Sequence, residues 1–370
     1  MRVLVYLSGH GFGHAARTTQ VVNALVEADP STEVHIRTTV PAWFLRASLH
    51  APFTLLAGAT DTGVVQPDSL SIDEAETARR AAAFYAHFAS HVAQEIDVIA
   101  RVRPDVVVAD IPPVACAAAA AVGVPSVAVS NFTWDWIYGG FPEFDVQAPG
   151  VRDTIAQANA QATLALRLPF HGGFDGMPRI EDAPLVARRA MVGRDVTRTL
   201  LELHADRPLV LATFGGHGGN VPLRDAADDG RFVVVATDYE VGSDQAPHPN
   251  LRVVSADTLT QHGLTYTDLL GACDMVATKL GYGIVSECLT NGVPLLYTVR
   301  GRFVEQDVFV RELPAVLRCR AIAPDALRAG RWGDDVAALL EQGTPTQVMR
   351  TDGAQWIAER VIREFGRGRT

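Results

Sequence analysis

The sequence predicts an α/β protein made of two Rossmann-like, doubly wound domains that face each other across a cleft. Short apolar runs of strand length alternate with helical segments in both halves of the chain, which is typical of parallel sheets covered by helices. With 370 residues, the chain is too long for one ordinary hydrophobic core. In each half, an apolar run is followed at once by closely spaced glycines and a helical segment. That order directs the first amide groups of a helix toward a ligand.

The first half is expected to form one domain over residues 1–170. Its predicted strands are residues 3–7, 34–38, 106–109 and 126–129. Residues 72–102 and 153–166 are expected to be helical, and residues 167–170 to form a short edge strand. Residues 171–184 are rich in glycine, proline and acidic residues, which predicts a linker.

The second half is expected to form another domain over residues 185–350. Its predicted strands are residues 209–212, 232–236, 252–254, 275–277 and 295–297. These runs end near polar or glycine-rich turns, so ligand-binding groups should gather at one edge of the sheet. A last helix at about 354–366 is a candidate to cross back onto the first domain.

Composition and charge narrow the class of protein. A net charge of -10 argues against a general nucleic-acid binder, which needs a basic surface. The chain starts directly with a predicted strand, so no signal peptide is expected. The most apolar run, residues 114–129, contains Gly123 and Pro125 and is too short to span a bilayer. The 4 cysteines are scattered, which indicates neither a zinc site nor a disulfide framework. We therefore expect a cytoplasmic enzyme without a transmembrane segment, of undetermined oligomeric state.

The first glycine turn carries two histidines. Gly9, Gly11 and Gly13 follow the first strand, and His14 stands at the mouth of the next helix. The turn does not indicate a dinucleotide site, because residues 36–39 lack the acidic residue that such sites place after the second strand. A histidine is suited to act as a base near neutral pH. His10 on the same turn is the rival base, with a turn-shaping or acceptor-contacting role as its alternative.

A second strand–turn–helix motif lies in the second half. Gly281 and Gly283 expose the backbone at a helix start, which favours binding of a diphosphate. Lys279 precedes them, and Glu287 lies further along that helix, where its carboxylate could accept both hydroxyls of a ribose. A further glycine turn, residues 213–219, is expected to face the same crevice.

These segments resemble a known family. Residues 9–17, 130–138, 279–283 and 300–303 are similar to the glycosyltransferase-like N-terminal part of plant L-arabinokinase. More broadly, the chain resembles GT-B glycosyltransferases, the group that includes UDP-sugar transferases of plants and of antibiotic synthesis and the lipid II transferase of peptidoglycan synthesis. The similarity runs roughly to Arg320, and the galactokinase-like domain of the plant proteins has no counterpart here.

The resemblance implies roles for particular residues. It implies that the nucleotide-sugar binds the second domain and the acceptor binds the first, with His14 as general base and Asp110 as its orienting carboxylate. The donor-binding set is Gly215, Gly216, His217, Lys279, Gly281, Tyr282, Gly283, Ser286, Glu287, Glu305 and Gln306. The acceptor-side set is His10, Gly11, Phe12, Gly13, Asn131, Trp134 and Trp136. One departure is that residues 279–282 read Lys-Leu-Gly-Tyr where the plant signature has His-Cys-Gly-Trp.

The expected activity is transfer of a sugar from a nucleoside diphosphate donor to an unidentified small-molecule or lipid-linked acceptor, with inversion. UDP is the expected carrier because the resembled families mostly use it, and dTDP and GDP remain open. No Asp-x-Asp pair occurs, which argues against a metal-dependent GT-A mechanism, so no metal or other cofactor is expected. The alternatives are a GT-B sugar-nucleotide epimerase and a catalytically silent sugar-nucleotide-binding module. The alternative role of Asp110 is to cap the following helix. The alternative role of the aromatic side chains in residues 132–138 is packing in the hydrophobic core.

Overall fold

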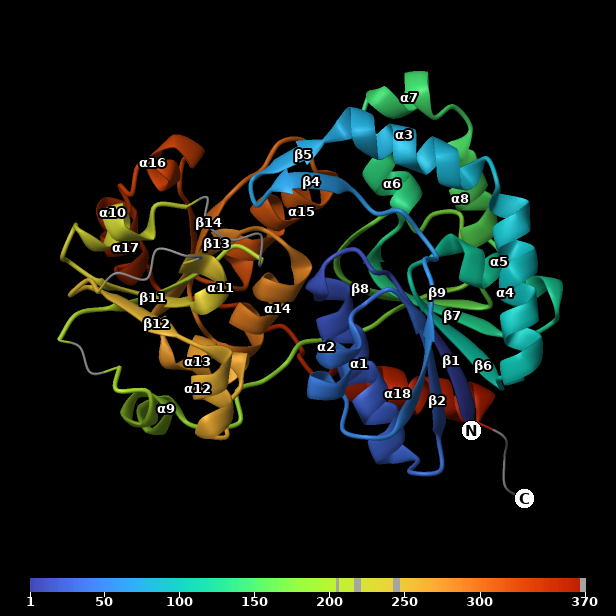
Figure 1. Cartoon of the computed structure of the whole chain (residues 1–370), viewed down its shortest axis with the longest axis horizontal. Helices are drawn as coiled ribbons and strands as arrows, with labels where there is room; N and C mark the ends of the chain where they lie inside the picture. Colours follow the sequence, from blue (N-terminus) through green and yellow to red (C-terminus); the bar gives the residue numbers. More distant parts are fainter. Residues whose placement is uncertain (204–205, 216–220, 242–246, 367–370) are drawn as a thin grey trace.

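This computed structural model of the chain describes residues 1–203, 206–215, 221–241 and 247–366. Two parallel α/β units lie side by side, the first on the right and the second on the left in Figure 1. None of the helices within the described ranges has the length and apolar composition that a bilayer-spanning segment requires.

The first unit is built on a parallel sheet of 7 strands. In spatial order these are β3 (Phe53–Ala57), β2 (Glu33–Thr38), β1 (Arg2–Leu7), β6 (Val106–Asp110), β7 (Ser126–Phe132), β8 (Leu164–Gly172) and β9 (Ile180–Asp182). Strands β1, β6 and β7 are mostly apolar and almost entirely buried, as expected for strands covered on both faces. The strand order reverses between β1 and β6, and ligands of such sheets bind outside the carboxyl ends of the strands at this point.

Helices and one hairpin surround this sheet. The helices are α1 (Phe12–Ala28), α2 (Ala42–Ser48), α3 (Glu74–Tyr85), α4 (Phe88–Val102), α5 (Pro113–Ala121), α6 (Trp134–Gly139), α7 (Glu143–Gln147) and α8 (Val151–Asn159). The antiparallel hairpin consists of β4 (Val65–Asp68) and β5 (Ser71–Asp73).

The second unit has a parallel sheet of 6 strands with the same arrangement around its centre. In spatial order these are β12 (Leu251–Val254), β11 (Val233–Thr237), β10 (Leu209–Thr213), β13 (Met275–Lys279), β14 (Leu295–Thr298) and β15 (Cys319–Ala321). The accompanying helices are α9 (Arg194–Leu200), α10 (Leu223–Ala227), α11 (Asp238–Val241), α12 (Ala256–Gln261), α13 (Tyr266–Ala272), α14 (Tyr282–Asn291), α15 (Val304–Glu312), a 3₁₀ turn (Leu313–Ala315), α16 (Pro324–Arg328) and α17 (Gly333–Leu340). This strand order reverses between β10 and β13. The two glycine turns of the second unit begin at the carboxyl ends of these two strands.

Several local predictions were wrong. The helix expected at 153–166 ends at Asn159, and a strand starts at Leu164, because a fully buried strand is as continuously apolar as a buried helix. That strand, β8, is internal and not an edge strand, because β9 pairs with its outer side. The first sheet therefore continues past residue 170 into the expected linker. Strands β3, β4, β5 and β15 were not predicted, since they are short or half-exposed.

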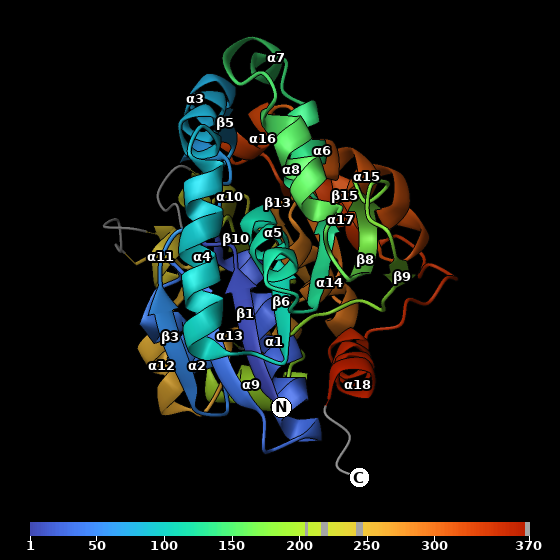
Figure 2. The same ribbon diagram turned by 90° about the vertical axis from the view of Figure 1, so that its right-hand side faces the viewer.

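The C-terminal helix α18 (Gly353–Phe365) lies against α1 of the first unit. Two ion pairs attach it to β9 and to the residue before that strand: Arg360 Nε to Glu181 Oε2 at 2.7 Å and Arg179 Nη1 to Glu364 Oε1 at 2.6 Å. Figure 2 shows α18 at the same end of the molecule as the N-terminus. The chain thus crosses twice between the units.

The two units also exchange apolar side chains above the cleft. The β4–β5 hairpin extends from the first unit toward the second (Figure 1), and its tip residue Leu70 is buried in the apolar cluster of the second unit. In return, Phe303 of the second unit is buried in a cluster of the first. Lys279 Nζ donates a hydrogen bond of 3.2 Å to Gln66 Oε1 on β4. These contacts hold the facing edges of the two sheets together.

Candidate active site

Two helix N-termini meet in the cleft between the units. Helix α1 begins after Gly11, whose φ of 74° is accessible to glycine at little cost, and α14 begins after Gly281. Gly13 and Gly283 are in contact, since a Cβ added to Gly283 would lie 3.3 Å from the Cα of Gly13. Free amide groups at both helix starts therefore face one space, which favours an anionic ligand.

A cavity of about 470 Å³ occupies this space. The predicted site residues that line it are His10, Gly11, Phe12, Gly13 and His14 from the first unit and Gly215, Lys279, Gly281, Tyr282, Gly283 and Glu305 from the second. The structure thus brings the two strand–turn–helix motifs into one site. Gly216 and His217 lie outside the described residues.

His14 and Asp110 form a buried pair. Asp110 ends β6 at the switch point, and its Oδ1 lies 2.9 Å from His14 Nδ1. Burial alone would raise the pKa of Asp110, but Arg17 and His14 hold that pKa well below its usual range. Arg17 Nη2 also lies 3.1 Å from Nδ1, but its two hydrogens are donated to Asp110 Oδ1 and Ser130 Oγ. Because an ionised carboxylate only accepts hydrogen bonds, Nδ1 carries the proton that is donated to Asp110. Nε2 is then the basic nitrogen, and none of the described residues is hydrogen-bonded to it.

Arg17 is a site residue that sequence reasoning missed. It lines the cavity, is 3% exposed, and donates to both oxygens of Asp110: Nε to Oδ2 at 2.7 Å and Nη2 to Oδ1 at 2.6 Å. Its guanidinium also lies over the Tyr282 ring of the second unit, 4.7 Å from the centroid. Its place one helical turn after His14 was the available signal, because residues three apart lie on one face of a helix.

Lys279 and Arg300 bring positive charge to the second unit's side of the cavity. Arg300 is buried and its Nε has no hydrogen-bond partner, while its guanidinium lies over the Phe303 ring. Burial, and to a smaller extent the neighbouring Arg300, together lower the pKa of Lys279 to about 7. Burial also lowers the pKa of Arg300. Within the described part of the chain, neither cation forms an ion pair.

Glu287, the residue expected to bind the hydroxyls of a ribose, lies behind the cavity lining. It is buried on α14 and does not line the cavity. Its Oε1 accepts from Arg188 Nε at 2.7 Å and is 2.6 Å from Arg188 Nη2. Arg188 comes from the segment that enters the second unit, and its guanidinium is 5.7 Å from the Tyr266 ring centroid. A ribose contact at Glu287 must therefore coexist with this ion pair or displace it.

The other predicted donor contacts divide into two kinds. Glu305 lines the cavity, and burial raises the pKa of its carboxyl. Gln306 instead bonds the backbone N and O of Arg300, both at 2.8 Å, and so shapes the loop before α15. Ser286 donates to the carbonyl of Gly283 at 2.8 Å within its own helix. Gln306 and Ser286 do not line the cavity.

The predicted acceptor-side aromatics mostly belong to the core. Trp134 is fully buried, with its ring 5.6 Å from that of His10 and 6.1 Å from that of His14. Its Nε1 donates to Asp61 Oδ2 at 3.0 Å. Trp136 packs against Gly172. Neither tryptophan lines the cavity, so their position supports the histidines and not a direct contact with an acceptor.

An aromatic platform borders the cavity on the first unit, and sequence reasoning identified only Phe12 of it. It consists of Phe12, Trp43 and Phe44, with Phe12 and Phe44 stacked at 4.9 Å between ring centroids. Phe12 is 43% and Trp43 55% exposed, and Pro41 just before α2 lines the cavity. Phe12 precedes His14 by two residues, so the three rings form an apolar surface beside the first turn of α1.

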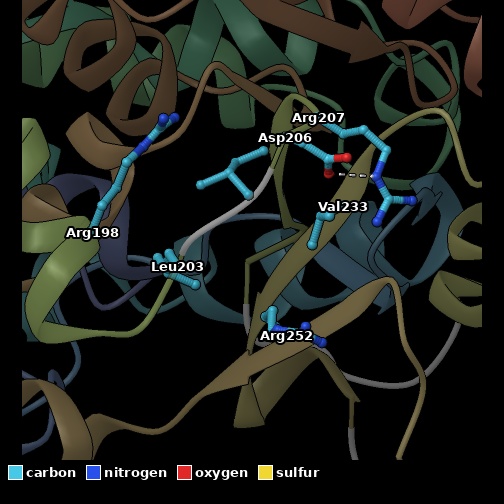
Figure 3. A pocket seen from close by; sticks show the side chains of 7 residues that line it. Arg198, Leu203, Asp206, Arg207, Val233 and Arg252 are labelled. Atoms are coloured by element: carbon cyan, nitrogen blue, oxygen red, sulfur yellow. Dashed lines mark hydrogen bonds and ion pairs between the residues drawn. The ribbon is translucent and has the colours of Figure 1, made fainter.

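A separate pocket of about 440 Å³ lies at the opposite edge of the second sheet (Figure 3). It includes Leu209 and Val233, the first residues of β10 and β11, so it is at the amino ends of the strands. Its arginines already have partners: Arg198 donates to the Ala272 carbonyl at 2.7 Å, and Arg207 to the Gly230 carbonyl at 2.7 Å. We therefore assign the candidate site to the cleft.

Comparison with known sequences gives two curated relatives, whereas no protein-family model matches. L-arabinokinase of Arabidopsis thaliana is 31% identical over 337 residues, which cover 88% of this chain and 31% of that protein. The UDP-N-acetylglucosamine–N-acetylmuramyl-(pentapeptide) pyrophosphoryl-undecaprenol N-acetylglucosamine transferase of Clavibacter michiganensis is 29% identical over 189 residues, 43% of this chain and 49% of the relative. The matched segments thus span less than half the length of each of these relatives.

Solved structures match over nearly the whole chain. Arabidopsis thaliana UGT89C1 complexed with UDP has a TM-score of 0.65 at 15% identity, covering 99% of both chains. The calicheamicin glycosyltransferase CalG4 has a TM-score of 0.60 at 15% identity, covering 99% of this chain and 95% of that chain. Glycosyltransferase VinC in complex with dTDP has a TM-score of 0.58 at 18% identity, with coverages of 99% and 96%.

Proposed function

We propose, from the GT-B fold that this chain shares with those glycosyltransferases, that it transfers a sugar from a nucleoside diphosphate to an acceptor hydroxyl or amine with inversion. The observation that carries the proposal is one cavity lined by His14, by the buried Arg300, by the half-buried Lys279 and by two helix N-termini, with His14 Nε2 free of hydrogen bonds to the described residues. The first group suits proton removal from an acceptor, and the others suit a departing diphosphate.

The donor diphosphate is assigned to the second unit's side of the cavity. Lys279 and Arg300 supply two positive charges, which match the two negative charges of a sugar diphosphate. The amide groups at the start of α14 add hydrogen-bond donors. UDP is the proposed carrier, because UGT89C1 was solved with UDP, and dTDP is the alternative, because VinC was solved with dTDP.

The proposed chemical step is a single displacement. His14 Nε2 takes the proton of the acceptor hydroxyl while that oxygen forms a bond to the anomeric carbon. The bond between the anomeric carbon and the phosphate oxygen breaks, and the nucleoside diphosphate leaves with its electron pair. Attack and departure occur on opposite faces, so the anomeric configuration inverts. Asp110 keeps the imidazole oriented and stabilises its charged form.

We propose that no divalent metal is needed for this step. The negative charge that develops on the leaving phosphate is met by Lys279, Arg300 and the helix amides. Glu305 is proposed to hold a hydroxyl of the donor sugar, since it lines the cavity between the units. Because Arg188 engages Oε1 of Glu287, we assign Oε2 to a ribose hydroxyl.

The acceptor is proposed to enter along the aromatic platform of Phe12, Trp43 and Phe44, which borders the cavity on the His14 side. An apolar part of the acceptor would pack on these rings while its hydroxyl reaches Nε2. Both a small molecule and a lipid-linked acceptor meet this description.

The test is a screen of UDP-, dTDP- and GDP-sugars against a panel of acceptors, read as release of nucleoside diphosphate and as a glycosylated product in mass spectrometry. Release that continues in the presence of EDTA and yields a product of inverted configuration supports the proposal. Interconversion of the donor sugar without release would favour the epimerase alternative, and donor binding without either reaction would favour the silent module.

A further inference from the structure

Arg17 makes more contacts inside the site than the proposed proton transfer needs. Besides its two bonds to Asp110, Nη2 donates to Ser130 Oγ at 2.8 Å and Nη1 to Asn131 Oδ1 at 2.6 Å. An arginine that is 3% exposed loses most of its hydration, so such a complete set of acceptors indicates a specific task.

The first part of that task concerns Asp110. Its carboxylate accepts from Arg17 at both oxygens, from Thr18 Oγ1 at 2.7 Å and from His14 Nδ1 at 2.9 Å. These four donors fill the lone-pair positions of the carboxylate. Asp110 therefore has no freedom to rotate, and His14 can bond it in one orientation only.

The second part concerns the second unit. Asn131 Nδ2 donates to Glu305 Oε1 at 2.8 Å across the cleft, so a continuous chain of hydrogen bonds runs from His14 through Asp110, Arg17 and Asn131 to Glu305. The guanidinium also faces the Tyr282 ring at the start of α14. The base is thus connected twice to the unit that is proposed to hold the donor.

We propose that Arg17 is a positioning residue that neutralises Asp110 and fixes the orientation of His14 while the two units are closed around a donor. The inference rests on the proposed function for its catalytic meaning, but its electrostatic content is independent of any reaction. Arg17 neutralises Asp110, so His14 lies beside a neutral pair and not beside a lone carboxylate.

The remaining groups near His14 do not offset this effect. Asp61, from the loop before β4, and Glu305, from α15, both interact with the imidazole, and burial raises the pKa of each carboxyl. The ring contacts of His14 are to Phe132 of β7 and Trp134 of α6, which carry no charge. Removal of the Arg17 charge should therefore favour the imidazolium form, so that His14 holds its second proton to higher pH.

The test compares Arg17→Gln, which loses the charge, with Arg17→Lys, which keeps a charge but loses the planar guanidinium that bonds both oxygens of Asp110. Arg79→Gln, at an exposed arginine of α3, is the matched control. Histidine-selective ¹⁵N NMR of the whole chain, without donor or acceptor, follows the protonation of His14, whose signals are assigned by their loss in His14→Gln. In Arg17→Gln the midpoint should move up by roughly one to three pH units, and much less in Arg17→Lys. The pH profile of nucleoside diphosphate release should move in the same direction, so that activity recovers at alkaline pH.

An unchanged midpoint in folded Arg17→Gln overturns the inference, because a purely structural arginine would not alter protonation. If Arg17→Gln does not fold, Asn131→Ala replaces it. Loss of that anchor should move the midpoint the same way by a smaller amount, and no movement again overturns the inference. If the NMR midpoint moves but no donor is ever cleaved, the proposed function fails while the inference stands. If donors are cleaved and the pH profile of Arg17→Gln equals that of the wild type, the proposed function stands while the inference fails.

Discussion

Gly13 and Gly283 lie against each other across the cleft, and the contact is asymmetric. A Cβ on Gly283 would come within 3.3 Å of the Gly13 Cα, whereas a Cβ on Gly13 would meet the Gly283 N at an ordinary 3.8 Å. The two helix N-termini that define the cavity can approach this closely because residue 283 has no side chain. The asymmetry leads to a direct prediction.

Gly283→Ala should weaken donor binding more than Gly13→Ala. The added methyl group presses on backbone that cannot rotate away, and overpacking of this kind costs about 1–3 kcal/mol, or roughly 5- to 150-fold in affinity. Calorimetric titration with a UDP-sugar measures both variants. Equal losses in the two would show that the close approach of the helices is unimportant.

Donor affinity should depend on the charge of Lys279. In the free protein the pKa of Lys279 is about 7, and the protonated form is the one that attracts a diphosphate. Affinity should therefore be greatest below pH 7 and fall as the pH rises, by up to about tenfold per pH unit, until the raised pKa of the bound state is reached. A UDP-sugar is the right probe, since its diphosphate does not titrate in this range.

Lys279→Met is the control for that pH dependence. It should bind the donor more weakly at low pH and show a flat profile across the same range. A wild-type profile that is already flat, or a Lys279→Met profile that still falls with pH, would contradict the assignment.

Glu287→Gln should reduce the preference of the protein for UDP over a UDP analogue that lacks the ribose hydroxyls. A hydrogen bond to a charged group contributes about 1.5–3 kcal/mol, so UDP should lose roughly tenfold or more in affinity. The analogue of UDP without 2′ and 3′ hydroxyls should bind the wild type weakly and be little affected by the substitution. The same loss for both ligands would indicate that the Arg188–Glu287 ion pair only supports the fold.

Trp43→Ala should raise KM for the acceptor and leave donor affinity unchanged. The ring of Trp43 is about half exposed on the platform, away from the Lys279 and Arg300 side of the cavity. The substitution removes this ring. Val348→Ala, at a highly exposed apolar residue elsewhere, is the matched control. An unaltered acceptor KM would remove the platform from the acceptor path.

The fold class could be predicted from the sequence because its signals are local. A glycine turn between an apolar run and a helix reports its own geometry, so the turns before α1 and α14 and the central strands of both sheets were identified. The α/β class with two Rossmann-like units and a GT-B arrangement is confirmed. The end of α8 was not predictable in the same way, because Leu164, Ala165 and Leu166 suit a buried helix as well as a buried strand.

The site was predictable only in part, because its finer features depend on long-range contacts. Arg17 binds Asp110 at a separation of 93 residues, and Glu287 meets Arg188 at a separation of 99. The spacing of three residues from His14 was a signal for Arg17, whereas nothing in the neighbouring sequence distinguishes Arg188 from a solvated arginine. Gln306 had the expected position after the turn but uses its amide on the backbone of Arg300, a choice that only the folded loop determines.

The central claim is that His14 is the base, and the most direct measurement is the rate of nucleoside diphosphate release by His14→Ala at a saturating concentration of donor. The account predicts a loss of about 10²–10⁴ in rate with donor affinity unchanged in calorimetry. Asp110→Asn should cost less, and His10→Ala less still, because His10 contacts the 64–66 segment and Trp134. An active His14→Ala beside an inactive His10→Ala would contradict the account.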